Sequence, residues 1–195
     1  MKTSVQFYFY NQNLVASVST YKQHVPEVMK MLESMLTESV FPEAEIEKVK
    51  AENKAWNQEQ MNDPDAVANN KLTHKIERYS KGHIFYSGTP QENIDGDEAV
   101  TRASILDFYQ KFLGGNHTTV TVVGDFDPKQ LDGLMQKHFG KWTSNTKYEK
   151  IERPFFETEK YVESINTPDK ENGALYAAIN IKVSEKNPDY PAVLM

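Results

Sequence analysis

The sequence of 195 residues contains no cysteine. It therefore has no disulfide framework, no thiolate zinc site and no cysteine nucleophile. No apolar run approaches the roughly 20 residues that span a bilayer, and the N-terminus lacks the basic, apolar and small-residue order of a secretory signal peptide. Membrane insertion is not expected, whereas the compartment stays open, because a chain without cysteine suits the periplasm and the cytoplasm alike.

Basic side chains are also few. The chain has 22 Lys and Arg against 28 Asp and Glu, a formal net charge of −6. Nucleic-acid binding depends on clustered Lys and Arg, which are scattered here, so neither a nucleic acid nor an anionic membrane surface is an expected partner. Hydrophobic residues make up 38% of the chain, enough for a core, and the composition is typical of a soluble globular protein.

The first half predicts two strands followed by three helices. Residues 5–10 and 14–19 flank a short polar turn and favour strands. Helices are expected from Pro26, from about Glu43 past Trp56, and from the Asp63-Pro64 cap signal toward Gly82. The predicted inner faces are Val28, Leu32, Met35 and Leu36 in the first helix, Ile46, Val49 and Trp56 in the second, and Val67, Leu72, Ile76 and Tyr79 in the third.

The second half begins with a predicted surface loop over residues 83–97, which has no sustained period. A helix capped by Thr101 follows, with Ile105, Phe108, Tyr109 and Phe112 as its apolar stripe. The β-branched run 118–123 then predicts a buried strand, and a helix runs from the Asp127 cap to Gly140. Its predicted inner face is Leu131, Leu134, Met135 and Phe139, and Gln130 could complete a capping box.

The character of the chain changes after Trp142. Residues 143–159 are polar, charged and interrupted by proline, as in a connector. Apolar residues alternate over 175–183, which predicts a strand, and helical character begins at Pro188. Because the chain starts in a strand and stops in an apolar segment, we expect a fragment: residues 1–142 as the later part of one domain, 143–159 as linker and 160–195 as the truncated opening of the next.

Four motifs occur in a family-like order: "FPEAEIEKVKAE" over 41–52, "ILDFYQKF" over 105–112, "VVGDFDP" with "FG.W" over 122–142, and "TPDKEN" over 167–172. Together they resemble the insulinase/pitrilysin family of zinc metallopeptidases, and the resemblance covers nearly all of the chain. The "TPDKEN" segment with the following strand is similar to the opening of a further domain in the later half of long bacterial members.

The resemblance implies an α+β fold in which helices pack on one face of a mostly antiparallel sheet. Family members have repeated domains of this kind, and two halves close like a clamshell around an unfolded peptide. Their zinc site is an H-x-x-E-H on a helix: two histidines bind the metal, the glutamate between them is the base, and a later glutamate completes the ligands. This sequence has no H-x-x-E-H. Zinc is therefore expected in the catalytic domain of the parent protein.

The five histidines of the chain are candidate metal ligands. His24 and His74 each have a glutamate three residues on, Glu27 and Glu77, but the second histidine is replaced by Val28 and by Arg78. Neither position can present two imidazoles, and Arg78 would repel a cation. The remaining three share no spacing: His83, His117 and His138. We expect no catalytic, cofactor-binding or metal-binding residue in this chain.

Two groups of acidic residues have ordinary explanations. Glu45, Glu47 and Glu52 lie where an active domain would place its last zinc-binding glutamate, but lysines interleave with them as on a solvated helix face. Asp125 and Asp127 suit a turn and a helix cap rather than a divalent cation. Gly124 lacks the second glycine and the lysine of a phosphate loop, so it is interpreted as a turn glycine.

The leading hypothesis is a non-catalytic domain of an insulinase-like zinc metallopeptidase that forms part of the chamber around peptide substrate. Two alternatives stay open: a catalytic domain whose H-x-x-E-H lies upstream of residue 1, or a scaffold relative without peptidase activity. The expected partners are other domains of the same polypeptide and a peptide that adds as a strand to a sheet edge. The resemblance favours the periplasm or cell envelope.

Overall fold

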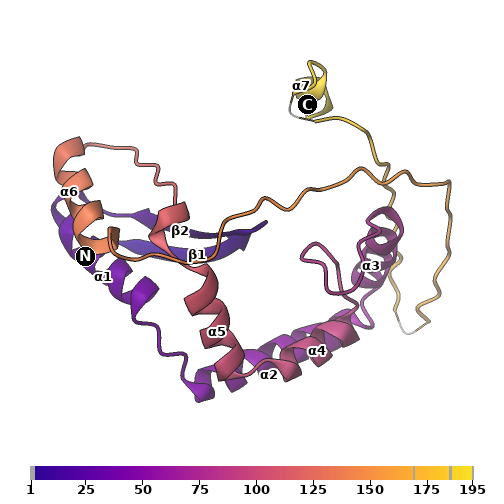
Figure 1. The fold of residues 1–195 in the computed structure, drawn as a ribbon. Coiled ribbons are helices and arrows are strands. Elements are labelled where there is room, and N and C mark those ends of the chain that lie inside the picture. Colours follow the sequence, from indigo (N-terminus) through magenta and orange to yellow (C-terminus); the bar gives the residue numbers. More distant parts are fainter. Residues whose placement is uncertain (1–2, 169, 185, 195) are drawn as a thin grey trace. The chain divides into compact units, whose positions relative to one another are not determined.

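The computed structural model describes residues 3–168, 170–184 and 186–194. The chain divides into two compact units. Unit 1 comprises residues 1–47 and 100–151, and unit 2 comprises residues 48–99 and 152–195. Each unit is therefore built from two separate stretches of sequence, and Figure 1 shows the elements of both.

Unit 1 contains the sheet of the described chain. Strand β1 (Ser4–Tyr10) pairs antiparallel with β2 (Asn13–Ser19), in a register that runs from Ser4 opposite Ser19 to Tyr10 opposite Asn13. Asn11 in the connecting turn has φ 55°, a left-handed conformation that asparagine tolerates better than most residues. The two strands predicted from the sequence are confirmed.

The helices of unit 1 follow the sheet. The short 3-10 helix η1 (Lys22–His24) leads into α1 (Val25–Thr37), and α5 (Arg102–Phe112), the 3-10 helix η2 (Gly115–His117) and α6 (Pro128–Phe139) come from the second stretch. Helix α1 packs against α6. Val28 and Leu32, at 2% and 8% exposure, form the core on the α1 side, as their helical spacing predicts. Met35, predicted for the same face, is 43% exposed.

Unit 2 is mainly helical. It holds the larger part of α2 (Glu43–Gln60), together with α3 (Pro64–Ile76), α4 (Pro90–Ala99) and α7 (Tyr190–Val193). Helices α2 and α4 meet through polar side chains: Lys54 Nζ lies 2.7 Å from Glu98, Asn53 donates to Asp97, and Asn93 donates to Asn57. The buried residue of α4 is Ile94, at 4% exposure.

Helix starts are the best-predicted local feature. Asp127 accepts hydrogen bonds from the backbone amides of Lys129 and Gln130 and so caps α6, and Asp63 caps α3 through the amide of Ala66. Thr101 and Ser104 form a reciprocal capping box at the start of α5. Each cap satisfies backbone N–H groups that the first helical turn leaves without an intrahelical partner.

The predicted inner face of α2 is wrong at two of its three residues, since Ile46 alone is half-buried. Val49 and Trp56 are 51% and 63% exposed, and the buried residue of this helix is the polar Asn57. Asn57 bonds to the carbonyl of Asn53 and to Asn93 of α4. The face of α2 that contacts α4 is therefore polar. Burial of Asn57 is tolerated because its amide group has hydrogen-bond partners.

Two predicted boundaries are also corrected. The predicted loop 83–97 contains most of α4, which begins at Pro90. This helix lacks a strong apolar stripe, so periodicity alone does not reveal it. The third helix ends at Ile76 rather than continuing toward Gly82, since Glu77 has an extended conformation. Tyr79, expected on its inner face, therefore lies beyond the helix.

The predicted strands 118–123 and 175–183 do not form in the described structure. Val123 and Leu175 are each 94% exposed, and Ile179 is 78% exposed. Both segments have the β-branched or alternating pattern of strands, but such a pattern is stabilised only by a neighbouring strand and a packed face. Neither has that neighbour in the part of the chain that the structure describes.

The α+β class is confirmed by the helices and the antiparallel β1–β2 sheet. Among the described residues, no helix is both long enough and apolar enough to cross a membrane. Residues 143–159 contain neither helix nor strand, and α7 confirms the helical character after Pro188.

Candidate functional site

His24 and His74 are the histidines whose sequence surroundings most resemble the family signature, and neither lies in a metal-binding arrangement. His24 precedes α1, and its Nδ1 lies 3.7 Å from Glu27. Val28, where a second histidine would be needed, is buried in the core at 2% exposure. His74 lies on α3 with its ring edge-on to Tyr86, and its buried Nε2 has no hydrogen-bond partner. Neither imidazole meets a second one.

His83 and His117 contact aromatic rings. His83 stacks on Tyr79, with ring centroids 4.6 Å apart and an interplanar angle of 11°, and its Nδ1 accepts a hydrogen bond from the amide of Phe85. His117 lies beside Tyr148, with 6.3 Å between the ring centroids. These contacts orient the imidazoles as packing groups rather than as a convergent set of ligands.

His138 has the most specific polar contact of the five histidines. Its side chain is 6% exposed, and its Nδ1 lies 2.6 Å from Oε2 of Glu33. The contact joins α6 to α1, whose residues are 105 positions apart. Sequence spacing could not show this pair, because it depends on how the two helices pack.

The donor set does not fit the zinc ion that the family resemblance implies. Within residues 3–168, 170–184 and 186–194, no three His, Asp or Glu side chains are grouped closely enough to hold a metal ion. A structural or catalytic zinc site uses at least three protein ligands, whereas Glu33 and His138 supply two. No catalytic step through zinc is therefore assigned to these residues.

The acidic candidate ligands lie on the surface of the molecule. Glu45 lies in the first turn of α2, where a carboxylate favours the helix dipole, and Glu52 lies farther along the same helix and is exposed. Glu47 belongs to the same exposed run. Asp125 forms an ion pair of 2.8 Å with Lys22, and both side chains are exposed.

An open depression lies at Lys22 and is lined by Tyr21, Lys22 and Gln23. It lacks the enclosure of a small-molecule pocket.

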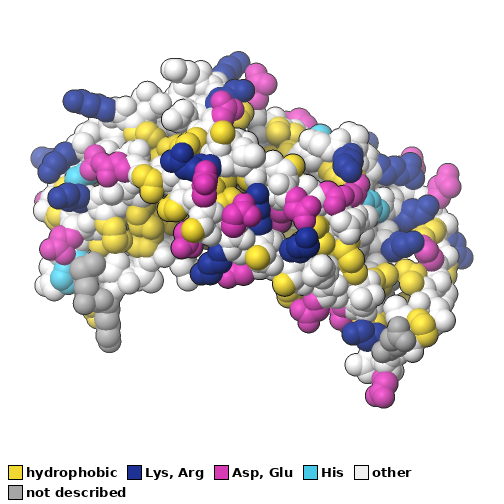
Figure 2. Space-filling model, turned by 90° about the horizontal axis from the view of Figure 1, so that it is seen from below, with side chains coloured by type: hydrophobic (Ala, Val, Ile, Leu, Met, Phe, Trp, Pro, Cys, Tyr) yellow, Lys and Arg dark blue, Asp and Glu magenta, His cyan; other side chains and the backbone are white. Residues whose placement is uncertain are grey.

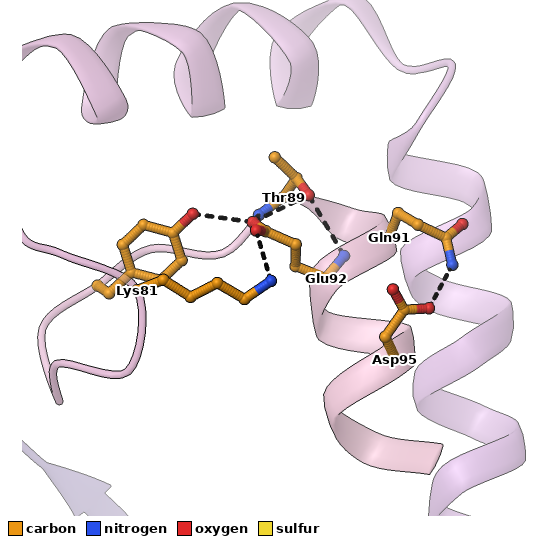
Figure 3. Close-up of polar contacts among 6 residues, drawn as sticks. Lys81, Thr89, Gln91, Glu92 and Asp95 are labelled. Atoms are coloured by element: carbon orange, nitrogen blue, oxygen red, sulfur yellow. Dashed lines mark hydrogen bonds and ion pairs between the residues drawn. The ribbon is translucent and has the colours of Figure 1, made fainter. Parts of the chain in front are cut away.

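The densest polar network surrounds Glu92, a residue that sequence reasoning did not single out. Figure 3 shows its carboxylate between Lys81 and Thr89. It accepts hydrogen bonds from the amide of Thr89 at 3.0 Å, from the Tyr86 hydroxyl at 2.9 Å and from Lys81 Nζ at 3.0 Å. The amide of Glu92 in turn bonds to the Thr89 hydroxyl. Thr89 and Glu92 therefore form a capping box at the start of α4.

The same network changes the acidity of its members. The hydrogen bond from the Thr89 amide, with those from Lys81 and Tyr86, lowers the pKa of Glu92 to about 2. The Glu92 carboxylate raises the pKa of Lys81 and of Tyr86. The network fixes a helix start, and the T-x-x-E spacing with Pro90 between would have revealed it in the sequence.

One protein-family model matches a part of this chain. Residues 99–194 match the family model of the Peptidase M16 inactive domain. The match supports a relationship between this region and the M16 family. The matched region starts just before α5 and ends within the last described residues. An M16 inactive domain implies a larger multidomain protein. No curated protein matches the chain.

The part of the chain that matches the M16 model has many exposed apolar side chains. Val123, Val162, Leu175 and Ile179 are all more than three quarters exposed. On the face drawn in Figure 2, hydrophobic side chains are interspersed with acidic and basic ones.

Proposed function

We propose that this chain is a non-catalytic part of an M16 zinc metallopeptidase, and that it contributes a wall of the chamber that encloses an unfolded peptide. The observation that carries the proposal is the match of residues 99–194 to the Peptidase M16 inactive domain. In this proposal the zinc ion and its H-x-x-E-H belong to another domain of the parent protein, and the other domains are the direct partners of this chain.

The placement of the acids and histidines supports a non-catalytic role. Where the signature helix would need a second histidine, the chain has the buried Val28 at one position and Arg78 at the other. The strongest carboxylate network, around Glu92, is used to start a helix. Its carboxylate accepts from an amide, a hydroxyl and an ammonium group, which leaves it poorly suited to act as a base on water.

The sheet of unit 1 supports a peptide-binding role. It has two strands in the described chain, so each strand has one outer edge without a partner strand there. An extended peptide can add to such an edge through backbone hydrogen bonds, while side-chain pockets select its sequence. Phe9 and Tyr10, at 69% and 65% exposure, offer aromatic contact area beside the edge of β1.

The test uses the purified 195-residue chain, an unstructured peptide and the same peptide with alternate backbone nitrogens methylated. Bound zinc is measured by atomic absorption, peptide binding by calorimetry and peptide cleavage by mass spectrometry, with and without chelator. We expect substoichiometric zinc, no cleavage, saturable binding of the unmodified peptide and at least tenfold weaker binding of the methylated peptide. The methylated peptide keeps every side chain and loses the donors that strand addition requires.

Two results would overturn the proposal in different ways. Stoichiometric zinc with cleavage that a chelator abolishes would show that the chain has its own active site. Equal affinity for the two peptides, or no binding of either, would remove the role in enclosing substrate through a sheet edge. In the latter case a scaffold relative without peptidase activity becomes the better explanation.

A further inference from the structure

The sequence places an asparagine or aspartate directly before a glycine at three points: Asp95-Gly96, Asp132-Gly133 and Asn172-Gly173. In such a pair the backbone nitrogen of the glycine can attack the side-chain carbonyl carbon of the preceding residue, and the product is a five-membered succinimide ring. Glycine favours this attack because it has no Cβ to hinder the approach. The three pairs share one possible reaction, and the fold decides which of them undergoes it.

Two of the three pairs lie inside helices. Gly96 belongs to α4 and Gly133 to α6. At an interior helical position the glycine N–H is hydrogen-bonded to the carbonyl four residues earlier, so the attacking nitrogen is held along the helix axis and away from the preceding side chain. The Asp95 carboxylate also accepts a hydrogen bond of 2.7 Å from Gln91. Both aspartates are therefore protected while their helices remain folded.

The Asn172-Gly173 pair has a different environment. Residues 170–183 contain neither helix nor strand (Figure 1), and both residues of the pair are exposed. Within the described ranges, neither the Asn172 side chain nor the Gly173 N–H has a hydrogen-bond partner. A Cβ added to Gly173 would meet nothing within 4 Å. The two groups that meet in the succinimide ring are thus protected neither by hydrogen bonds nor by packing.

Two other asparagines show what protects such a side chain elsewhere in the chain. The Asn116 amide pairs with the backbone of Ser144, since it donates to the carbonyl at 3.0 Å and accepts from the amide at 2.9 Å. Asn187 precedes Pro188, whose nitrogen carries no proton to lose in the attack. Asn172 has neither kind of protection.

We propose that Asn172 is a deamidation site of the folded chain. The backbone nitrogen of Gly173 forms a bond to Cγ of Asn172 and loses its proton, while the side-chain nitrogen leaves as ammonia. Water then opens the ring at either of its two carbonyls, which gives aspartate or isoaspartate at position 172. Each product adds one negative charge to a chain whose formal net charge is −6. The inference does not depend on the peptidase assignment.

Isoaspartate also lengthens the main chain by one methylene group, because the backbone then continues through the former side chain. Farther along the segment, the Tyr176 hydroxyl donates to Asp65 of α3 at 3.1 Å, and Asn180 donates to the carbonyls of Ile76 and Phe156. The added length falls before these contacts. The modification therefore changes the charge and the length of an exposed segment, while the helices of unit 2 remain folded.

The test compares the folded full chain with the same chain unfolded in guanidinium chloride, both incubated at mildly alkaline pH and then digested in acid. Mass spectrometry measures the replacement of nitrogen by oxygen at Asn172, and electron-transfer fragmentation separates isoaspartate from aspartate at all three pairs. We expect folding to slow the reaction at Asn172 by less than threefold. At Asp95 and Asp132 folding should slow isoaspartate formation at least tenfold, because the helix must open first.

Two variants check the route of the reaction. Asn172→Gln removes the five-membered ring, and Gly173→Ala adds a Cβ at the attacking residue in a place with open space around it. Each should lower isoaspartate formation at this position at least tenfold, and the circular dichroism of both should match that of the native chain.

Three results would overturn the proposal. The first is protection of Asn172 by folding to the threefold level or beyond, since it would show that the segment is not accessible to the reaction. The second is aspartate without isoaspartate at this position, since direct hydrolysis by water gives that product alone. The third is a Gly173→Ala variant that reacts as fast as the native chain.

Discussion

Oε2 of Glu33 lies 2.6 Å from Nδ1 of His138, and this contact joins α1 to α6 in unit 1. Because an ionised carboxylate can only accept a hydrogen bond, Nδ1 carries the proton. The imidazole is nearly buried, at 6% side-chain exposure, whereas the carboxylate is 35% exposed. The pair therefore satisfies a polar group that the packing of the two helices removes from water.

Glu33→Ala is expected to destabilise unit 1 by about 1–3 kcal/mol, because it leaves a buried donor without a partner. The free energy of unfolding is measured by urea denaturation followed by circular dichroism. Glu27→Ala, at a carboxylate that is 72% exposed on the same helix, is the matched control and should change the free energy by less than about 0.5 kcal/mol. Equal losses in the two variants would contradict a specific role for the Glu33–His138 contact.

The Glu92 network predicts an acid-sensitive start of α4. The pKa of Glu92 is about 2, below its ordinary value of 4.5. A lowered pKa in the folded chain means that the carboxylate stabilises the fold fully above about pH 4.5, and that this stabilisation disappears as the pH falls toward 2. The urea midpoint of the native chain should therefore drop more between pH 5 and pH 2.5 than that of Glu92→Gln.

Glu98→Gln is the control for this pH dependence, since Glu98 is 57% exposed and has an ion pair with Lys54. It should keep the pH dependence of the native chain. A Glu92→Gln variant whose midpoint falls as steeply as the native one would show that other carboxylates cause the acid sensitivity.

The cap of α6 should contribute more than the neighbouring surface ion pair. Asp127→Ala removes the acceptor for the amides of Lys129 and Gln130, and should cost about 1 kcal/mol of stability. Asp125→Ala breaks an exposed ion pair with Lys22 and should cost less than about 0.5 kcal/mol. The two free energies of unfolding are compared under identical conditions, and the reverse order would refute the capping role.

Two glycine substitutions should have opposite effects. A Cβ at Gly114 would lie 2.2 Å from the backbone nitrogen of Ser144, so Gly114→Ala is expected to destabilise unit 1 by about 1–3 kcal/mol. At Gly133, inside α6, a Cβ meets nothing within 4 Å. Gly133→Ala should stabilise the helix by about 0.5–1 kcal/mol. Thermal unfolding of both variants checks the signs, and a stabilised Gly114→Ala chain would contradict the close approach.

The features predicted correctly from the sequence are the local ones. The Asp63, Thr101 and Asp127 caps depend on residues within one helical turn, so their signals are contained in the sequence around them. The absence of H-x-x-E-H is also visible in the sequence alone. The start of α4 had such a local signal at Thr89 and Glu92, which a search for apolar periodicity does not detect.

The remaining features depend on neighbours that a single segment does not specify. Trp56 has the spacing of an inner-face residue, but α2 meets α4 through Asn57 instead. The sequences around Val123 and Leu175 have the residue pattern of β-strands, but both residues are exposed. A strand forms there only if another strand pairs with it. The Glu33–His138 contact requires two helices to meet across more than a hundred residues.

The chain has two tryptophans, and one falls in each unit. Trp142 of unit 1 is half-buried, with its ring near Phe139 and its carbonyl bonded to the amide of Gly115, whereas Trp56 of unit 2 is 63% exposed. An indole already in water changes its emission little when the chain unfolds. The intrinsic fluorescence of the protein should therefore report the unfolding of unit 1 almost alone, and Trp56→Phe should leave that optical signal nearly unchanged.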